Sequence, residues 1–201
     1  MDPKLSALYA DLAACRRCAD AGYLVASTPI FSGAPGAVFM TVGQAPGRRE
    51  AEVTHRPFSG PAGKRLFRWL AQAGFDETHF RATQAMTAIT KCYPGPHPAG
   101  RGDRLASRAE QVFCAPWLER EMALINPRVV IPIGGLAIGR FTDGTRTMTE
   151  IIGSCRERDG RIVVPLPHPS GASQWFNAPE NKERLARALA ILSELRRELL
   201  G

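Results

Sequence analysis

Four short apolar runs constrain the fold of this chain more than any other feature of its sequence. Three of the runs are apolar almost throughout, the run at residues 83–90 mixes apolar residues with threonine and glutamine, and each run is followed by a segment with helical spacing. Strands of this kind are buried on both faces, and their alternation with helices is typical of a parallel sheet. The runs lie at residues 37–42, 83–90, 128–133 and 161–166. The sequence therefore predicts an α/β fold, a single domain over residues 1–201 whose central, mostly parallel four-stranded sheet is flanked by helices on both faces.

Helical segments are expected around these strands at residues 3–14, 61–73, 105–125, 136–141 and 179–200. Leucines at core spacing give the first and the last of them an apolar face. Pro61 in the first turn and Gly74 after the last turn are ordinary signals for the start and the end of a helix. The Gly-, Pro- and Arg-rich stretch that ends at Gly60 is expected to be an ordered surface loop, and residues 94–103 a second loop.

Polar and reactive residues follow three of the predicted strands. In parallel α/β sheets the carboxyl ends of the strands meet at one edge, and ligands bind there. Three motifs are therefore expected at a single edge: Gly43-Gln44-Ala45-Pro46-Gly47, Thr90-Lys91-Cys92 and His168-Pro169-Ser170. A histidine at a strand end is often a hydrogen-bonded structural residue, but the rigid neighbours of His168 favour a functional role.

The chain is basic, with 26 lysines and arginines against 19 acidic residues and a net charge of +7. This excess leaves two interpretations open, a nucleic-acid-binding protein and a merely basic soluble one. No apolar run approaches the roughly 18 residues of a membrane span, and the N-terminus lacks a signal-like pattern, so we expect a cytoplasmic location and no membrane partner. Residues 59–64 lack the spacing of a phosphate-binding loop, which argues against nucleotide hydrolysis.

Four of the five cysteines, Cys15, Cys18, Cys92 and Cys114, form a soft-ligand set for one metal centre. Four thiolates suit either zinc or an iron–sulfur cluster. Zinc ribbons usually pair two C-x-x-C units, and this chain has one, which favours a cluster. The alternative is four unrelated buried thiols. The odd number of cysteines argues against a disulfide scaffold, and Cys155 is expected to be incidental.

The order of these motifs resembles that of the uracil-DNA glycosylase superfamily, most closely its iron–sulfur type, family 4. The matching residues are Cys15 and Cys18, residues 43–51, residues 57–63, residues 87–92, Cys114 and residues 168–171. The resemblance extends over essentially the whole chain and implies the α/β/α fold of that superfamily. It also implies a structural [4Fe-4S] cluster held by the four cysteines.

The resemblance further implies a pocket for a base that has been flipped out of DNA. Phe58 would stack on the base, and backbone amides around Gly43, Gln44 and Ala45 would bind a uracil carbonyl. His168 would donate a hydrogen bond to uracil O2. The residues expected to be catalytic are His168, Gln44 and Glu50, and the residues expected to bind substrate are Gly43, Gln44, Ala45, Phe58, Ala88 and His168.

DNA contacts are expected at Ser170, Gly171, Trp175 and Arg101. Trp175 is the candidate for a wedge that fills the gap left by the flipped base, because apolar wedges hold opened base steps. The alternative is that Trp175 packs against the last helix. His97 lies in the loop where one branch of the superfamily uses a histidine to trap DNA covalently, and its alternative is an exposed loop residue.

Three positions depart from the family pattern. Gln44 stands where the family has an acidic residue, so the usual carboxylate for positioning water is absent there. Glu50 matches a later acidic position, while Ala51 replaces the following Asp. Ala88 replaces the Asn that would read the uracil edge, so selectivity must come from other groups. These departures indicate a divergent branch.

The function expected from these residues is hydrolysis of the N-glycosidic bond of uracil in single- or double-stranded DNA by a monofunctional, monomeric repair enzyme. Ala88 motivates one alternative, a glycosylase for hypoxanthine or xanthine. Gln44 motivates another, a protein that binds or traps uracil-DNA with weak turnover.

Overall fold

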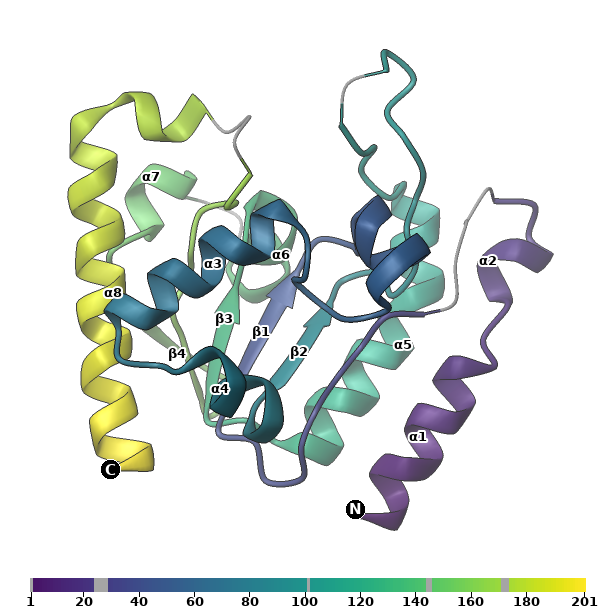
Figure 1. Ribbon diagram of the computed structural model, residues 1–201, viewed down its shortest axis with the longest axis horizontal. Helices are drawn as coiled ribbons and strands as arrows, with labels where there is room; N and C mark the ends of the chain where they lie inside the picture. Colours follow the sequence, from purple (N-terminus) through teal and green to yellow (C-terminus); the bar gives the residue numbers. More distant parts are fainter. Residues whose placement is uncertain (1, 24–28, 101, 144–145, 171–173) are drawn as a thin grey trace.

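A five-stranded sheet forms the centre of the molecule (Figure 1). The computed structural model describes residues 2–23, 29–100, 102–143, 146–170 and 174–201. The strands lie in the order β2-β1-β3-β5-β4. Their bounds are Phe39–Gly43 for β1, Ala85–Ala88 for β2, Val129–Pro132 for β3, Arg156–Arg158 for β4 and Arg161–Val163 for β5. The first four strands in this order pair in parallel, which confirms the predicted mostly parallel α/β fold.

The predicted number of four strands was wrong, because β4 pairs antiparallel with β5 and adds a fifth strand at the edge. Its residues are Arg156, Glu157 and Arg158, and they have no apolar run that a sequence pattern could detect. A short, charged edge strand of this kind is a common protection against pairing with other chains.

Helices cover both faces of the sheet, as predicted. Phe39 and Ile131 face α3 (Pro61–Gln72) and α8 (Pro179–Leu200), in a core that includes Leu66, Leu70, Leu189 and Leu192. Met40 and Val130, which are adjacent to Phe39 and Ile131 in the same strands, pack with α1 (Pro3–Ala13) and α5 (Arg108–Ile125). Successive side chains of a strand point to opposite faces, so a strand covered on both faces is mostly apolar along its whole length.

Shorter elements complete the chain: α2 (Arg17–Asp20), α4 (Glu77–Thr83), α6 (Gly135–Phe141), α7 (Met148–Ile151), the π-helical turn η1 (Glu50–Thr54) and the 3₁₀ turn η2 (Gln174–Asn177). The segment before Gly60 is therefore not a plain loop. The helix expected from residue 105 begins at Arg108, because Ser107 and Glu110 form a capping box there. Among the described residues, no helix combines the length and apolar character needed to cross a membrane.

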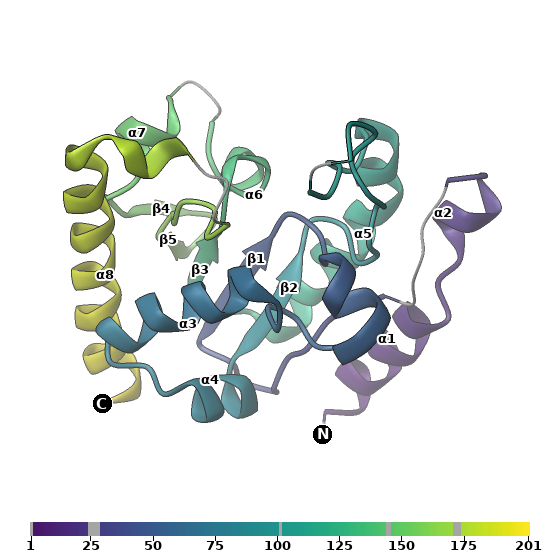
Figure 2. The same ribbon diagram turned by 45° about the horizontal axis from the view of Figure 1, so that its top comes forward.

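The carboxyl ends of four parallel segments meet at one edge of the sheet. Gly43 lies opposite Ala88 in the β1–β2 register, and Ile133 forms a parallel bridge with Leu166 beyond the end of β3. Gln44, Ala88, Gly134 and His168 therefore come together although they are far apart in sequence. Figure 2 shows the loops that follow these strand ends gathered above the sheet.

Candidate active site

A cavity of about 360 Å³ lies at this edge, and its lining includes all the residues predicted to be catalytic or to bind substrate. These are Gly43, Gln44, Ala45, Glu50, Phe58, Ala88 and His168. Thr87, Asp103 and Ile133 also line it and were missed. Thr87 and Ile133 look like ordinary strand residues in the sequence, and only their register at the strand ends brings them to the cavity.

His168 is held in a defined protonation state. Its Nδ1 accepts a hydrogen bond from the backbone N–H of Ser170, with a donor–acceptor distance of 3.2 Å. An Nδ1 that accepts a hydrogen bond carries no proton, so the proton of the neutral ring is on Nε2. Burial lowers the pKa of His168 from its ordinary value, which keeps the ring neutral near pH 7. The side chain is therefore a neutral donor through Nε2.

Gln44 and His168 lie on the same side of the cavity, next to Gly134. A Cβ atom at residue 134 would be 2.5 Å from Nε2 of Gln44 and 3.0 Å from Cδ2 of His168. Gly134 also has a φ of +81°, in the region that favours glycine. A side chain at this position would therefore strain the backbone and displace the Gln44 amide, and the missing Cβ leaves room for the amide and the imidazole to come close.

The ring of Phe58 lies against the end of β1. A Cβ at Gly43 would be only 2.9 Å from Cζ of Phe58, so the ring contacts the backbone where the strand leaves the sheet. Phe58 itself has a φ of +49°, which is uncommon for a bulky residue. Its side chain is half-buried and packs at the margin of the core beneath α3.

Glu50 lies in η1 and is only 8% exposed. Its Oε1 accepts hydrogen bonds from the backbone N–H groups of Ser59, at 3.0 Å, and Gly60, at 2.8 Å. This carboxylate therefore holds the loop that carries Phe58. The catalytic role expected for Glu50 stays a prediction.

Ala88 presents a methyl group to the cavity, and its carbonyl oxygen is already hydrogen-bonded. The buried Lys91 ammonium donates to this oxygen at 2.7 Å and pairs with the buried Glu121 carboxylate, also at 2.7 Å. The Thr87 hydroxyl joins the same network by donating to Glu121 at 2.9 Å. The Ala88 side chain therefore offers no hydrogen-bonding group that could read a base edge.

Asp103 brings a second carboxylate to the cavity. Its Oδ1 accepts a hydrogen bond from the Tyr93 hydroxyl at 3.0 Å. Burial, followed by this hydrogen bond, raises the pKa of Tyr93 to about 12, so the phenol stays protonated and donates. In the sequence, Asp103 is an acidic residue in the Pro- and Gly-rich loop. It was not predicted as a site residue because no sequence pattern places that loop at the cavity.

The residues predicted to contact DNA have different surroundings. The carbonyl oxygen of Ser170 accepts a hydrogen bond from Nη1 of Arg65 at 3.1 Å. The Trp175 side chain packs against a buried cluster of Ile138, Ile151 and Ile152 from the α6–α7 region, and the Trp175 backbone carbonyl accepts a hydrogen bond from Asn181 of α8. The indole therefore packs on α6 and α7, and α8 contributes this backbone hydrogen bond. The wedge role of Trp175 stays a prediction. Gly171 and Arg101 lie outside the described residues, and the exposed His97 accepts a hydrogen bond from Ala99 through Nδ1.

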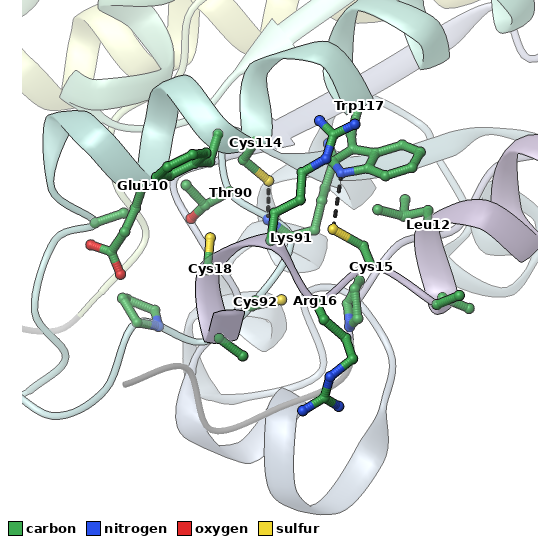
Figure 3. Close-up of a pocket in the computed structure, with 18 residues that line it drawn as sticks. Leu12, Cys15, Arg16, Cys18, Thr90, Lys91, Cys92, Glu110, Cys114 and Trp117 are labelled. Carbon is green, nitrogen blue, oxygen red and sulfur yellow. Dashed lines mark hydrogen bonds between the residues drawn. The ribbon is translucent and has the colours of Figure 1, made fainter. Parts of the chain in front are cut away.

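The four predicted metal ligands line a second cavity, of about 390 Å³. Cys15 and Cys18 come from the α1–α2 region, Cys92 follows β2, and Cys114 lies in α5. Figure 3 shows their sulfur atoms around a common space. Two nitrogen donors point at these sulfurs: the Lys91 backbone N–H at Cys114 and the Trp117 indole N–H at Cys15, each at 3.2 Å.

The electrostatics of this cavity suit a cationic centre. Burial, and then the charges of the other three cysteines, raises the pKa of Cys92 to about 12, and burial raises that of Cys114 to about 11. Ionised thiols would therefore repel one another here unless a metal centre compensated for them. No group of three described His, Cys, Asp or Glu side chains has the arrangement that a single metal ion requires.

The sequence matches known proteins over most of its length. The family described as the uracil DNA glycosylase superfamily matches residues 31–193. A Type-4 uracil-DNA glycosylase of Thermotoga maritima is 31% identical over 131 residues, which cover 64% of this chain and 62% of that protein. A Type-4 uracil-DNA glycosylase of Sulfurisphaera tokodaii is 26% identical over 171 residues, 81% of this chain and 72% of that protein. One from Pyrobaculum aerophilum is 29% identical over 123 residues, 61% of this chain and 54% of that protein.

Proposed function

The chain belongs to the uracil-DNA glycosylase superfamily, and on that premise we propose that it excises uracil from DNA by hydrolysing the N-glycosidic bond. The observation that carries this proposal is the cavity of about 360 Å³ that His168, Gln44 and Phe58 line together. A flipped base needs a closely fitting pocket, a flat surface to stack on and hydrogen-bond donors at its edge. The three side chains supply the ring and the donors.

His168 is proposed to stabilise the leaving group. When the bond between C1′ and N1 breaks, its electron pair goes to the base, and negative charge gathers on O2. The neutral imidazole, with its proton on Nε2, donates a hydrogen bond to that oxygen. Burial, which lowers the pKa of this ring, keeps it in the neutral state in which it acts as a fixed donor. The backbone amides of Gln44 and Ala45 are assigned to another carbonyl of the base.

The attack of water at C1′ completes the hydrolysis. Gln44 cannot take a proton as a carboxylate would, but its amide oxygen can accept a hydrogen bond from water. The carboxylates that line the cavity are those of Glu50 and Asp103. We assign to these two the task that an acidic residue at position 44 would otherwise perform, which is to orient water and offset the cationic charge on the sugar.

The four cysteines are proposed to hold a [4Fe-4S] cluster with a structural role. When bound, such a cluster would offset part of the negative charge of four thiolates and tie separate segments of the chain together. Cys15, Cys18, Cys92 and Cys114 connect the α1–α2 region, the exit of β2 and α5 around it. The N–H groups of Lys91 and Trp117 act as the outer-shell donors that sulfur ligands usually have.

The proposed partner is uracil-containing DNA, bound by a monomer. Arg48 and Arg49 are exposed and line the cavity, where their guanidinium groups suit the phosphates on either side of a flipped nucleotide. These contacts carry no sequence information, so we expect binding that weakens with salt and varies little with sequence.

Single-turnover excision from a uracil-containing duplex tests the proposal. His168→Ala removes the donor and should slow the step by about 100- to 1,000-fold. Phe58→Ala removes the stacking surface and should weaken transition-state binding by about 1–3 kcal/mol. His79→Ala, at an exposed histidine of α4, is the matched control and should react at the wild-type rate. Wild-type rates in both cavity variants would contradict the assignment of this cavity.

Ala88 favours a second candidate, a glycosylase for another deaminated base such as hypoxanthine or xanthine. Its methyl group cannot form a hydrogen bond to a base edge, and its carbonyl oxygen already accepts one from Lys91. Parallel assays on duplexes with uracil, hypoxanthine or xanthine separate the two candidates. Excision of hypoxanthine without excision of uracil would favour the second.

A further inference from the structure

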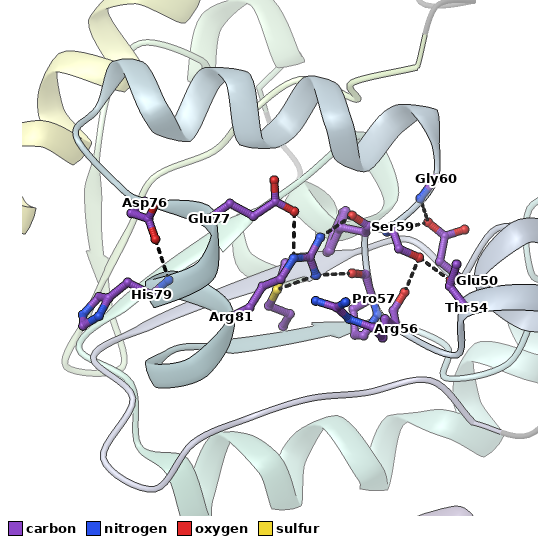
Figure 4. Close-up of polar contacts among 12 residues, drawn as sticks. Glu50, Thr54, Arg56, Pro57, Ser59, Gly60, Asp76, Glu77, His79 and Arg81 are labelled. Carbon is purple, nitrogen blue, oxygen red and sulfur yellow. Dashed lines mark hydrogen bonds and ion pairs between the residues drawn. The ribbon is translucent and has the colours of Figure 1, made fainter.

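The loop that carries Phe58 lies between two charged side chains from different elements (Figure 4). Arg81 in α4 reaches the loop from one side, and Glu50 in η1 reaches it from the other. Together they bond four consecutive backbone positions. The guanidinium binds the carbonyl groups of residues 57 and 58, and the carboxylate binds the amides of residues 59 and 60.

Arg81 makes an unusually complete set of contacts. Its Nη1 donates to the carbonyl oxygen of Pro57 and its Nη2 to that of Phe58, each at 2.8 Å. Its Nε donates to Oε1 of Glu77 at 2.9 Å, and its guanidinium lies 4.3 Å from the centre of the Phe67 ring. The side chain is 12% exposed. The planar fork of arginine suits two parallel bonds of this kind, and a lysine offers only a point charge.

The loop needs such fixing because Phe58 has a left-handed backbone. A bulky residue at a φ of +49° is strained, and it keeps that conformation only where the surrounding structure imposes it. The conformation directs the ring at Gly43, so that it forms one wall of the base cavity. Gly63 packs directly against the Phe58 carbonyl group, because a Cβ at residue 63 would lie 1.8 Å from the carbonyl oxygen.

We propose that Arg81 is a positioning residue for base recognition, acting with Glu50 as a two-sided clamp on the strained backbone of Phe58. This inference rests on the proposed function, in which the Phe58 ring stacks on the flipped base. Arg81 does not line the cavity itself, but it bonds to Pro57 and Phe58, which do. Its effect on excision passes through the position of the ring, and an orientation error of about 1 Å at a reacting centre can slow catalysis by about 100-fold.

Arg81 also joins α4 to α3, so a loss of activity alone would not separate positioning from folding. The test is therefore a double-mutant cycle between Arg81→Met and Phe58→Ala, measured as single-turnover excision from a uracil duplex. Arg81→Met keeps most of the apolar stem and removes both hydrogen bonds to the loop. Arg140→Met is the matched control, because Arg140 pairs with Glu119 on the surface and has no contact with the loop.

The clamp predicts a specific pattern of rates. Arg81→Met should slow excision by about 10- to 100-fold in the wild-type background and by less than about twofold when residue 58 is already alanine. Affinity for a duplex with an abasic site, which has no base to stack, should stay within about twofold of the wild type. Arg81→Lys, which keeps the charge but not the fork, should recover part of the rate. Arg140→Met should change none of these quantities.

Each contrary result has a distinct meaning. An equal loss of rate in the Phe58→Ala background, or a parallel loss of abasic-site affinity, would overturn the clamp and assign Arg81 to general stability. If Arg81→Met does not fold, the same cycle with Arg81→Lys decides the question, because wild-type excision in that variant would overturn the need for the fork. A wild-type protein that does not excise uracil would instead refute the proposed function.

Discussion

At the scale of single residues, the cavity has a hydrogen-bond donor of the expected kind at His168 and a residue without a hydrogen-bonding side chain at Ala88. His168 has the protonation state that a leaving-group donor requires, because the Ser170 N–H occupies its Nδ1. Ala88 lacks any side-chain group that could read a base edge, and Lys91 already binds its carbonyl oxygen. Selectivity in this protein must therefore depend on the shape of the cavity and on groups other than the side chain of residue 88.

The substitution Ala88→Asn tests this view of selectivity. The new amide would face the cavity and offer both a donor and an acceptor to uracil, for about 1–3 kcal/mol of added discrimination. We expect the ratio of excision rates for uracil over hypoxanthine to rise. Competition assays with both lesions measure the ratio. Ala88→Ser, which lacks the two-sided amide, is the matched control, and an unchanged ratio in Ala88→Asn would indicate that residue 88 does not face the base.

At the scale of elements, the start of α5 shows how one carboxylate fixes a helix and a loop together. Glu110 accepts hydrogen bonds from Arg104 at 2.6 and 2.7 Å and from the Ser107 backbone at 2.7 Å. The Arg104 hydrogen bonds are the main reason that the pKa of Glu110 falls to about 2, although its burial opposes the shift. The hydrogen bonds of Glu110 thus join the end of the long Pro- and Gly-rich loop to α5, the helix that carries Cys114.

The lowered pKa of Glu110 predicts a pH-dependent stability. Because the folded pKa lies below the unfolded one, the stabilisation is fully present above the ordinary carboxyl range near pH 4.5 and is lost as pH falls toward about 2. Glu110→Gln should lower the free energy of unfolding at pH 7 by about 1.5–3 kcal/mol. Denaturant unfolding at several pH values measures the difference in the free energy of unfolding between wild type and variant. This difference should become smaller below pH 4.5. A constant difference would contradict the assignment.

At the scale of the whole molecule, the two cavities share a structural connection. Lys91 donates its backbone N–H to Cys114 and its side-chain ammonium to Ala88. The residue beside Cys92 thereby links the cysteine cavity to the wall of the base cavity. A metal centre that fixes the four cysteines would also stabilise the strand end at which the base is expected to bind.

The cysteine cavity predicts the behaviour of the purified protein. The wild type should be brown, with absorbance at about 400 nm and bound iron. Cys114→Ser should lower both iron content and thermal unfolding temperature, because the cluster ties α5 to the α1–α2 region. Cys155→Ser, at an exposed cysteine outside the cavity, is the matched control and should keep both. Stoichiometric zinc in place of iron would contradict the cluster.

Much of the architecture could be predicted because its signals are local. Apolar runs in β1 and β3 marked strands that are buried on both faces, and the leucine spacing of α8 marked a helix whose bounds at Pro179 and Leu200 matched the prediction. The strand β4 was not predicted, because charged edge residues bury little apolar surface and leave no apolar pattern. Helix α4 was not predicted, because its seven residues include only one buried side chain, Phe80.

The sequence by itself determined the kind of fold and the motifs that lie at the site, because strand periodicity and short motifs are encoded in neighbouring residues. Tertiary structure alone decided the partners of those residues. In the sequence, Arg81 looks like an exposed arginine of a helix, but in the structure α4 packs beside the Phe58 loop and Arg81 binds it. Asp103 looks like an acidic loop residue, but its loop reaches the cavity. Contacts between distant segments depend on how whole elements pack, and no local pattern specifies that packing.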